Sequence, residues 1–218
     1  MSMICLTISD EIVPAIYSLN IKQRFGDVGC VLSCGDLPYY YLEFIVTMLC
    51  VPCYYVKGNH DTVEIRENGD VLTEPCGCVS LETTCVVHEG TLIGGLGGSV
   101  RYNQEPGPQY TEVEMLTRIW RMAPHLIVNR LRYGRYLDVL LTHAPPLGIH
   151  NGPDRPHRGF RAFLFFMDMF APRYLIHGHV HRSYGVREPW QTRYRRTLVI
   201  NTAGYRLVSI SESKAVMS

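Results

Sequence analysis

The sequence predicts an α/β protein built as a four-layer α-β-β-α sandwich, with two mixed sheets packed face to face and helices outside them. Short apolar runs alternate with amphipathic segments over the first 60 residues, which is the pattern of a β-α-β-α-β unit. Further apolar runs and two helical patterns follow, enough for a second sheet. Polar residues recur where the runs end, and ligands bind at such carboxyl ends in open α/β sheets.

The elements of the first half follow from the spacing of apolar residues. Ile4–Ser9 and Val28–Ser33 are expected to be buried strands, and Cys53–Lys57 a third. Val13–Phe25 suits a helix between the first two strands. In Tyr39–Leu49 the apolar residues fall on one helical face, which predicts a second helix. These five elements would form the first sheet and its covering layer.

The second half begins with a predicted hairpin of Val86–Val87 and Thr91–Leu96. Thr111 and Glu114 then have the spacing of a capping box, which predicts a helix running to Met122. The remaining expected elements are a strand at Leu137–Thr142, an apolar helix at Phe160–Phe170 and strands at Tyr174–Ile176, Thr197–Ile200 and Arg206–Ile210. Because no linker or repeat separates these elements, we expect a single domain over residues 1–218.

Charge and hydropathy argue against two classes of partner. The formal net charge of +1 gives no global attraction to nucleic acid or to anionic membranes. No apolar run approaches the ~18 residues of a membrane-spanning helix. The N-terminal run leads directly into Asp10, with no basic region before it and no cleavage site. We therefore expect a cytoplasmic protein with no membrane partner.

The eight cysteines lie in the first half of the chain, at positions 5, 30, 34, 50, 53, 76, 78 and 85. Cys50 and Cys53 have the spacing of a zinc knuckle, which Cys76 and Cys78 could complete. However, four of the eight lie in or beside apolar runs, where a free cysteine behaves as a small hydrophobic residue. Reduced cytosolic thiols are therefore the favoured interpretation.

Polar side chains that can bind metal follow five of the predicted strands. They are Asp10, Asp36, the run Asn59-His60-Asp61, His143, and His179 with His181. Taken singly, a Gly-Asp pair is usually a turn and a lone histidine after a strand is usually structural. Taken together, carboxylates, an amide and imidazoles at neighbouring strand ends form a donor set that suits Mn, Fe, Zn or Co. The ordered set therefore predicts a metal site.

The order and spacing of these residues resemble the calcineurin-like metallophosphoesterases. That family's pattern is Asp-x-His, Gly-Asp, Gly-Asn-His-Asp or Glu, a His, and Gly-His-x-His. The matching residues here are Asp10, Gly35-Asp36, Gly58–Asp61, His143 and Gly178–His181. They span most of the chain, so the resemblance implies the family's fold and a metal-dependent phosphoesterase activity.

The resemblance also implies roles. Asp36 would bridge two ions, completed on one side by Asn59, His143 and His179 and on the other by Asp10 and His181. His60 would stabilise or protonate the leaving group, and Asp61 would orient its ring. The implied reaction is hydrolysis of a phosphomonoester or phosphodiester by in-line attack of a metal-bridging hydroxide, with Mn, Fe or Zn as the metals. The substrate would be a phosphoester small molecule or a nucleotide.

The chain departs from the family's pattern at one position. The usual Asp-x-His is Asp10-Glu11-Ile12 here, so an alkyl group replaces a ligand. Glu11 is a neighbour that could compensate, but it is expected to point elsewhere. The resemblance therefore implies that the site of Asp10 and His181 binds metal more weakly than the site of Asn59, His143 and His179.

Three residues outside the pattern are candidate substrate contacts. Arg101 could bind a phosphate in bidentate fashion. His150 lies in a loop rich in proline and glycine after His143, and such loops commonly carry specificity. Arg158 opens the apolar helix, whose N-terminus favours phosphate. Each also has a structural explanation, as a surface arginine, a solvated loop histidine or part of a helix cap.

Two other functions stay open on the sequence. The histidine missing at position 12 fits a non-catalytic scaffold on the same fold, although the retained His60 favours an enzyme. The segment His181–Arg196 interleaves five arginines with three aromatic residues, a composition that suits single-stranded nucleic acid. A surface hairpin with solvated arginines explains this segment as well and is favoured. The helix Phe163–Phe170 is apolar nearly all round, which fits either a homo-oligomer contact or complete burial.

Overall fold

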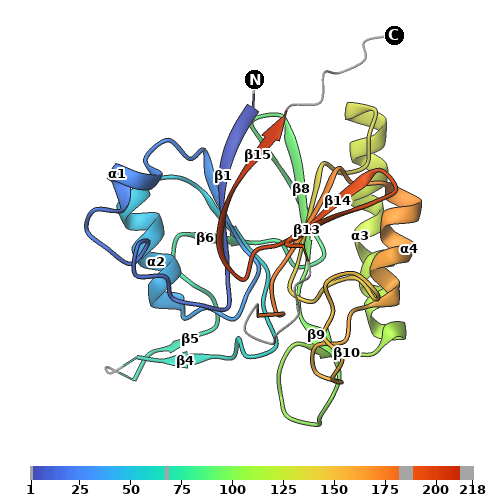
Figure 1. The fold of residues 1–218 in the computed structure, drawn as a ribbon, viewed down its shortest axis with the longest axis horizontal. Helices are drawn as coiled ribbons and strands as arrows, with labels where there is room; N and C mark the ends of the chain where they lie inside the picture. Colours follow the sequence, from blue (N-terminus) through green and yellow to red (C-terminus); the bar gives the residue numbers. More distant parts are fainter. Residues whose placement is uncertain (1, 67–68, 182–188, 212–218) are drawn as a thin grey trace.

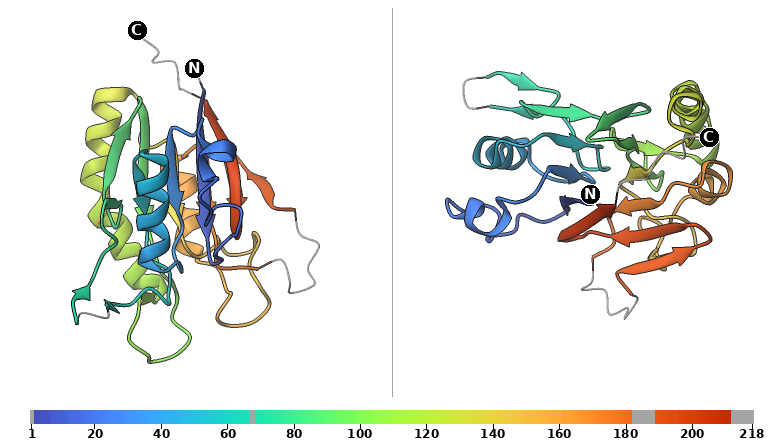
Figure 2. Two further views of the ribbon diagram at one scale, coloured as in Figure 1. Left: turned by 90° about the vertical axis from the view of Figure 1, so that its left-hand side faces the viewer. Right: turned by 90° about the horizontal axis from the view of Figure 1, so that it is seen from above.

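The structure, a computed structural model, describes residues 2–66, 69–181 and 189–211. Two sheets lie against each other, and helices cover the outer face of each (Figure 1). Seen from above, both sheets lie between helices of the first half of the chain and helices of the second half (Figure 2). The predicted class, two mixed sheets with flanking helices, is confirmed.

The first sheet has the strand order β15-β1-β2-β3-β6. Its strands are β1 (Ser2–Ser9), β2 (Cys30–Ser33), β3 (Cys53–Tyr55), β6 (Cys78–Ser80) and β15 (Gly204–Ser211). β1, β2, β3 and β6 run parallel, and β15 pairs antiparallel with β1 along its whole length. Helices α1 (Ile21–Phe25) and α2 (Tyr39–Leu49) cover its outer face.

The second sheet has the order β13-β14-β12-β11-β8-β7. Its strands are β7 (Cys85–His88), β8 (Thr91–Leu96), β11 (Val139–Thr142), β12 (Tyr174–His177), β13 (Gln191–Tyr194) and β14 (Thr197–Asn201). The four inner strands are parallel, and the two edge strands pair antiparallel. Helices α3 (Glu112–Tyr133) and α4 (Arg161–Phe170) cover it. Two small ladders complete the fold, β4 (Glu64–Ile65) with β5 (Val71–Leu72) and β9 (Ser99–Val100) with β10 (Gln109–Tyr110).

Side chains of one strand alternate between two cores, because successive residues of a strand point to opposite faces. In β1, Cys5 packs between the sheets while Leu6 packs under α1 and α2. In β11, Leu141 packs between the sheets while Leu140 packs under α3 and α4. Strands β2, β3, β11 and β12 and the second half of β1 are thus almost wholly buried on both faces. Their carboxyl ends lead into the polar residues of the candidate site.

The cysteines are free thiols, and those of the first strands serve as small core residues. Cys5, Cys30 and Cys34 are buried between the sheets, whereas Cys50 is exposed at the end of α2. Among the described residues, the one grouping of His, Cys, Asp and Glu with metal-binding distances contains no cysteine.

Two predicted helices differ from those in the structure. The helix expected over Val13–Phe25 forms only at its end, over Ile21–Phe25, and the preceding residues form turns. There the Ser18 hydroxyl accepts a hydrogen bond from the Asn20 amide at 3.3 Å, and such side chains compete with helical hydrogen bonding. The prediction missed the competition because it weighed only apolar spacing.

Helix α3 opens at the predicted capping box and continues past Met122 to Tyr133, although Pro124 lies within it. Ile119, Met122 and Leu126 keep one face buried against the second sheet, and this packing offsets the hydrogen bond that proline removes. No described helix, α3 included, is both long and apolar enough to cross a membrane.

Candidate metal centre

Three of the predicted ligands have a left-handed backbone conformation. Asp10, Asp36 and His179 have φ angles of 66°, 55° and 68°. This region costs a residue with a side chain about 1–3 kcal/mol, and such strain concentrates at functional sites. Each residue lies just beyond a strand, namely β1, β2 and β12. The strained turns therefore mark the edge where the parallel strands end.

Two glycines allow the chain to pass close to these ligands. A Cβ on Gly58 would collide with the carboxylate of Asp36, and one on Gly178 would collide with Ser9 and the carboxylate of Asp10. The Gly-Asn-His-Asp and Gly-His-x-His runs therefore begin with glycine because the backbone itself approaches the carboxylates.

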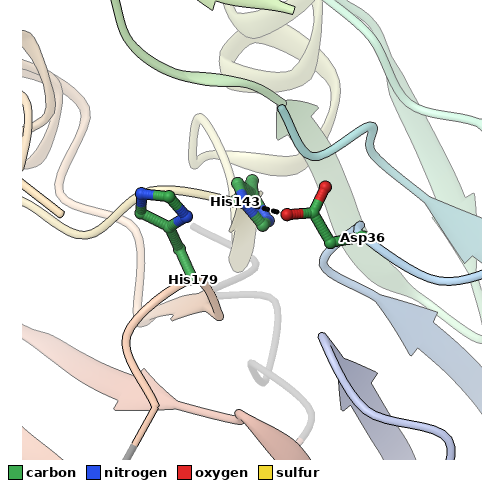
Figure 3. A group of neighbouring side chains, drawn as sticks. All are labelled: Asp36, His143 and His179. Carbon is green, nitrogen blue, oxygen red and sulfur yellow. Dashed lines mark ion pairs between the residues drawn. The ribbon is translucent and has the colours of Figure 1, made fainter. Parts of the chain in front are cut away.

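Asp36, His143 and His179 form a compact cluster (Figure 3). One potential ligand atom of each lies within 4.8 Å of the others. His143 Nε2 is 3.2 Å from Asp36 Oδ2 and 3.0 Å from Asn59 Oδ1. Both histidines and Asn59 are buried. The four residues predicted for one half of the site therefore meet, although they come from the turns that follow β2, β3, β11 and β12.

Backbone carbonyls fix the orientation of both imidazoles. His143 Nδ1 donates to the carbonyl of Cys34 at 2.7 Å, and His179 Nε2 donates to the carbonyl of Pro156 at 2.8 Å. Metal-ligating histidines are held in this way, with the proton on the nitrogen that does not bind metal. The other nitrogen of His143 faces the oxygens of Asp36 and Asn59, both of which are acceptors. This position requires a proton or a cation, so the donor set fits a divalent metal.

The pKa values of the cluster also indicate a proton or a cation at the position that His143 Nε2 faces. Burial alone would lower the pKa of His143, but the charge and hydrogen bond of Asp36 together with the charge of Asp10 raise it to about 9. Burial opposes ionisation of Asp36, yet His143 and the His60 amide lower its pKa to about 2. Burial and the charge of His143 lower the pKa of His179 to about 3. One proton is thus held at the position that a metal ion would take, and metal binding would release it.

The loop of His60 is held against Asp36 by its backbone. The His60 amide donates to Asp36 Oδ1 at 2.8 Å, and Asp61 Oδ2 accepts from the amides of Asp36 and Gly58 at 2.9 and 2.8 Å. Burial and the charge of Asp36 raise the pKa of Asp61 to about 6. The resemblance implied that Asp61 orients the ring of His60. In the structure its carboxylate accepts hydrogen bonds from these two backbone amides and so fixes the loop that carries His60.

The other predicted half, Asp10 with His181, is arranged differently. Asp10 Oδ2 accepts the backbone amide of His179 at 2.9 Å. His181 Nδ1 lies 3.0 Å from Glu11 Oε1, where both side chains are partly exposed. Ile12 is 40% exposed. The expectation that Glu11 points elsewhere is therefore wrong: its carboxylate contacts His181, because the hydrogen bond from the His179 amide to Asp10 brings the two turns together. The compact cluster includes neither Asp10 nor His181.

The three candidate substrate contacts all have protein partners or lie elsewhere. Arg101 pairs with Glu114 at 2.9 Å and donates to the carbonyl of Gln109. Arg158 is exposed and lines a separate hollow beside Trp120 and Phe165. His150 is buried instead of solvated. Substrate binding by these residues remains a prediction.

His150 belongs to a relay, a chain of hydrogen-bonded side chains from Thr192 to His177, that the sequence reasoning missed. Its Nδ1 donates to His177 Nε2 at 3.0 Å, and its Nε2 accepts from the hydroxyl of Thr192 at 2.8 Å. His177 Nδ1 in turn donates to the carbonyl of Gly178 at 2.9 Å. The relay supports the turn that carries His179. His177 was hidden because it ends an otherwise apolar strand, although its place two residues before His179 was a usable signal.

The arginine-rich segment lies only partly in the described chain. Arg182, Tyr184 and Arg187 lie outside the described residues. β13 and β14 form an antiparallel hairpin, and Arg195 pairs with Asp168 of α4 at 3.0 Å. The favoured interpretation of a surface hairpin agrees with this arrangement.

Comparisons with known proteins bear on the family and the fold of the chain. The sequence matches a model of the family described as calcineurin-like phosphoesterase over residues 25–183. Among solved structures, the chain is similar to the crystal structure of TT1561 of Thermus thermophilus, with a TM-score of 0.58 and 13% sequence identity. That match covers 96% of this chain and 98% of the other, and it supports the fold alone. A search of curated protein sequences found no match.

Proposed function

This chain belongs to the calcineurin-like phosphoesterase family, a family of metal-dependent phosphoesterases, and we propose that it hydrolyses phosphate esters at the cluster described above. The observation that carries the proposal is the buried His143 Nε2, which faces two acceptor oxygens at 3.0 and 3.2 Å. Hydrogen bonds to backbone carbonyls fix both imidazoles in a ligating orientation.

Asp36, Asn59, His143 and His179 would hold a divalent transition metal. When bound, such an ion neutralises phosphoryl oxygens and makes water a stronger nucleophile at neutral pH. The carboxylate of Asp36 keeps its negative charge over the working pH range, because His143 and the His60 amide hold its pKa near 2. Asn59 would contribute an uncharged oxygen, and its Nδ2 donates a hydrogen bond to the Tyr102 hydroxyl at 3.3 Å.

We propose that His60 acts on the leaving group. Its amide is fixed 2.8 Å from Asp36 Oδ1, and its side chain is exposed and lines a hollow with Asp61, Tyr39 and Glu64. An imidazole in this place can donate a proton to a departing oxygen. Asp61 positions this loop through the backbone amides of Asp36 and Gly58.

We further propose that metal ions bind the two halves unequally. Asp36, Asn59, His143 and His179 would take the first ion, and Asp10 with His181 would take a second one more weakly. Asp10 already accepts the His179 amide, and His181 is paired with Glu11.

The direct test is a metal reconstitution assay. The metal-free protein is given Mn, Zn or Mg singly and assayed with p-nitrophenyl phosphate and bis-p-nitrophenyl phosphate. We expect hydrolysis with at least one metal, reduced roughly 100-fold or more in His60→Ala, because general acid catalysis contributes about 10²–10⁴-fold. His125→Ala, at an exposed position on α3, is the matched control. No hydrolysis with any metal, or equal rates in wild type and His60→Ala, would overturn the proposal.

One observation favours a second candidate function, a non-catalytic scaffold on the same fold. Ile12 replaces the usual histidine, and the half beside it is engaged in contacts within the protein. The scaffold function requires metal binding without hydrolysis, so the same assay separates the two candidates.

A further inference from the structure

Helix α3 carries a stripe of exposed apolar side chains along its outer face. Val113, Trp120, Ile127 and Leu131 are 72%, 54%, 54% and 81% exposed. They follow one another at intervals of seven, seven and four residues, which places them on one face of an α-helix. The opposite face of α3 packs on the second sheet. The described residues therefore leave an apolar stripe about 27 Å long open on the outside of the molecule (Figure 1).

A hollow beside the first half of the stripe widens this face. It measures about 600 Å³ and lies between α3 and α4. Its apolar lining consists of Leu116, Trp120, Leu147, Ala162 and Phe165. Among the apolar side chains of α4, only Met169 is exposed. Most of the exposed apolar surface of the two helices therefore belongs to α3, with the hollow as its extension toward α4.

The stripe is arranged symmetrically about the middle of α3. Val113 and Leu131 lie nine residues on either side of Met122, and Trp120 and Pro124 lie two residues on either side. When a second α3 runs antiparallel to the first and the two meet at the level of Met122, each Val113 faces a Leu131 and each Trp120 faces a Pro124. A surface that matches itself in this way is what a two-fold dimer interface requires. A foreign protein or a membrane surface requires no such symmetry.

The charges at the ends of α3 favour the same antiparallel arrangement. The first turn carries Glu112 and Glu114, and the last turn carries Arg130 and Arg132. An antiparallel pair brings each acidic end beside the basic end of the other helix and opposes the two helix dipoles, whereas a parallel pair brings like charges together. Both glutamates accept backbone amides within their own chain, and Glu114 also pairs with Arg101. The end charges therefore set the direction of pairing, while the apolar stripe supplies the contact area.

We propose that this face binds a second copy of the chain, in a two-fold dimer whose α3 helices pair antiparallel. Ile127 and Leu131 of the second copy would then lie against the hollow beside Trp120. With its 22 residues α3 is about 33 Å long and 10 Å wide, and the hollow and α4 double that width, so the face covers on the order of 700 Å². A standard interface takes about 800 Å² from each partner. The inference concerns assembly and does not rest on the proposed function.

Sedimentation velocity of the full chain at a series of concentrations tests the dimer. We expect a dimer that dissociates on dilution, with a dissociation constant raised about tenfold or more in Leu131→Ser, because each dimer loses two buried leucine side chains. Leu19→Ser is the matched control, since Leu19 is 82% exposed and lies outside the stripe. A monomer at all concentrations up to about 100 µM, or equal effects of the two substitutions, would overturn the proposal.

Cross-linking tests the direction of pairing. Val113→Cys and Leu131→Cys are each made in a chain that carries Cys50→Ser and Cys76→Ser, because these two native thiols are exposed. A short bismaleimide should join the two variants when they are mixed and allowed to exchange, and should join neither variant to itself. Cross-linking of each variant alone would contradict the antiparallel arrangement, as would no cross-linking in the mixture.

Vesicle flotation separates a dimer face from a membrane-binding face. We expect the wild-type protein to stay unbound in the presence of phosphatidylglycerol vesicles, because the dimer covers the stripe and places its glutamates at the edge of the interface. Flotation of a monomeric protein that is lost in Leu131→Ser and kept in Leu19→Ser would overturn the proposal in favour of a membrane surface.

Discussion

The two halves of the candidate metal centre use the same kinds of residue and differ in what else those residues bind. In one half, His143 and His179 are buried and anchored to carbonyls by one nitrogen each, so the other nitrogen is presented to the cluster. In the other half, Asp10 accepts a backbone amide and His181 is paired with Glu11. The difference shows that ligand identity is not enough: a ligand must also have its remaining hydrogen bonds satisfied away from the metal.

The strained turns of the backbone also link the two halves. Asp10 and His179 both have left-handed φ angles, yet the amide of His179 is bound by the carboxylate of Asp10. Asp10 therefore helps to hold the turn that presents His179. The half formed by Asp10 and His181 therefore supports the half formed by Asp36, Asn59, His143 and His179. Asp10 keeps this supporting role even though position 12 is not a histidine.

The largest effect is expected from removing a ligand of the half formed by Asp36, Asn59, His143 and His179. His143→Ala removes a ligand and leaves the carboxylate of Asp36 without its partner at 3.2 Å. Affinity for the first Mn²⁺ should fall on the order of 1,000-fold, roughly one ligand's share of the binding free energy of a four-ligand site. Titration calorimetry measures it, with His125→Ala as the matched histidine control. A loss below about threefold would show that the ion binds elsewhere.

The next effect concerns His150, whose relay supports the turn that carries His179. Burial lowers the pKa of His150 to about 4, against about 6.5 for an unfolded histidine. The neutral ring therefore stabilises the fold fully above pH 6.5, and this contribution is lost as the pH falls from 6.5 to 4, about 3 kcal/mol in all. Denaturant unfolding across this range should show the loss.

The control for this prediction is His150→Gln, which keeps hydrogen-bonding groups toward His177 and Thr192 but does not titrate. The difference in unfolding free energy between wild type and variant should shrink as the pH falls from 6.5 to 4. A difference that stays constant across the range would mean that His150 is protonated in the folded protein.

A smaller effect should follow from restoring a histidine ligand to the half formed by Asp10 and His181. Ile12→His restores the family's usual residue at a position that is partly exposed, so the fold should tolerate it. The second step of a Mn²⁺ titration should strengthen about tenfold, equivalent to about 1.4 kcal/mol, and the first step should change little. Ile12→Leu is the matched control. An unchanged second step would show that the histidine at position 12 is not what limits this half.

The smallest effect is expected at Glu11. Its pair with His181 is exposed, and such pairs contribute about 0–1 kcal/mol. Glu11→Gln should therefore leave the second Mn²⁺ step within about threefold of wild type, or strengthen it by releasing His181. If the second step instead weakens tenfold, Glu11 is itself a ligand and replaces the missing histidine.

Much of the site could be predicted because metal ligands follow strands in a fixed order. Asp36, Asn59, His143 and His179 were named from sequence, and the structure brings them together. The strand positions also followed from apolar runs buried on both faces. These features are local, or depend only on strands being parallel, so the sequence reveals them.

What could not be predicted depends on contacts between distant segments. The pairing of Glu11 with His181, the relay from Thr192 to His177 and the stacking of Arg206 on Trp190 each join residues far apart in the chain. The end of α3 was missed for a related reason, because burial of Leu126 outweighs the local effect of Pro124. Tertiary packing decides these cases, and residue spacing does not report it.

The unequal halves can be tested most directly by anomalous scattering from crystals given one equivalent of Mn²⁺. We predict a strong peak between Asp36, Asn59, His143 and His179, with a weaker peak beside Asp10 and His181 that grows only at higher Mn²⁺ concentration. A filled Asp10 position with an empty His143 position would contradict the unequal binding proposed for the two halves.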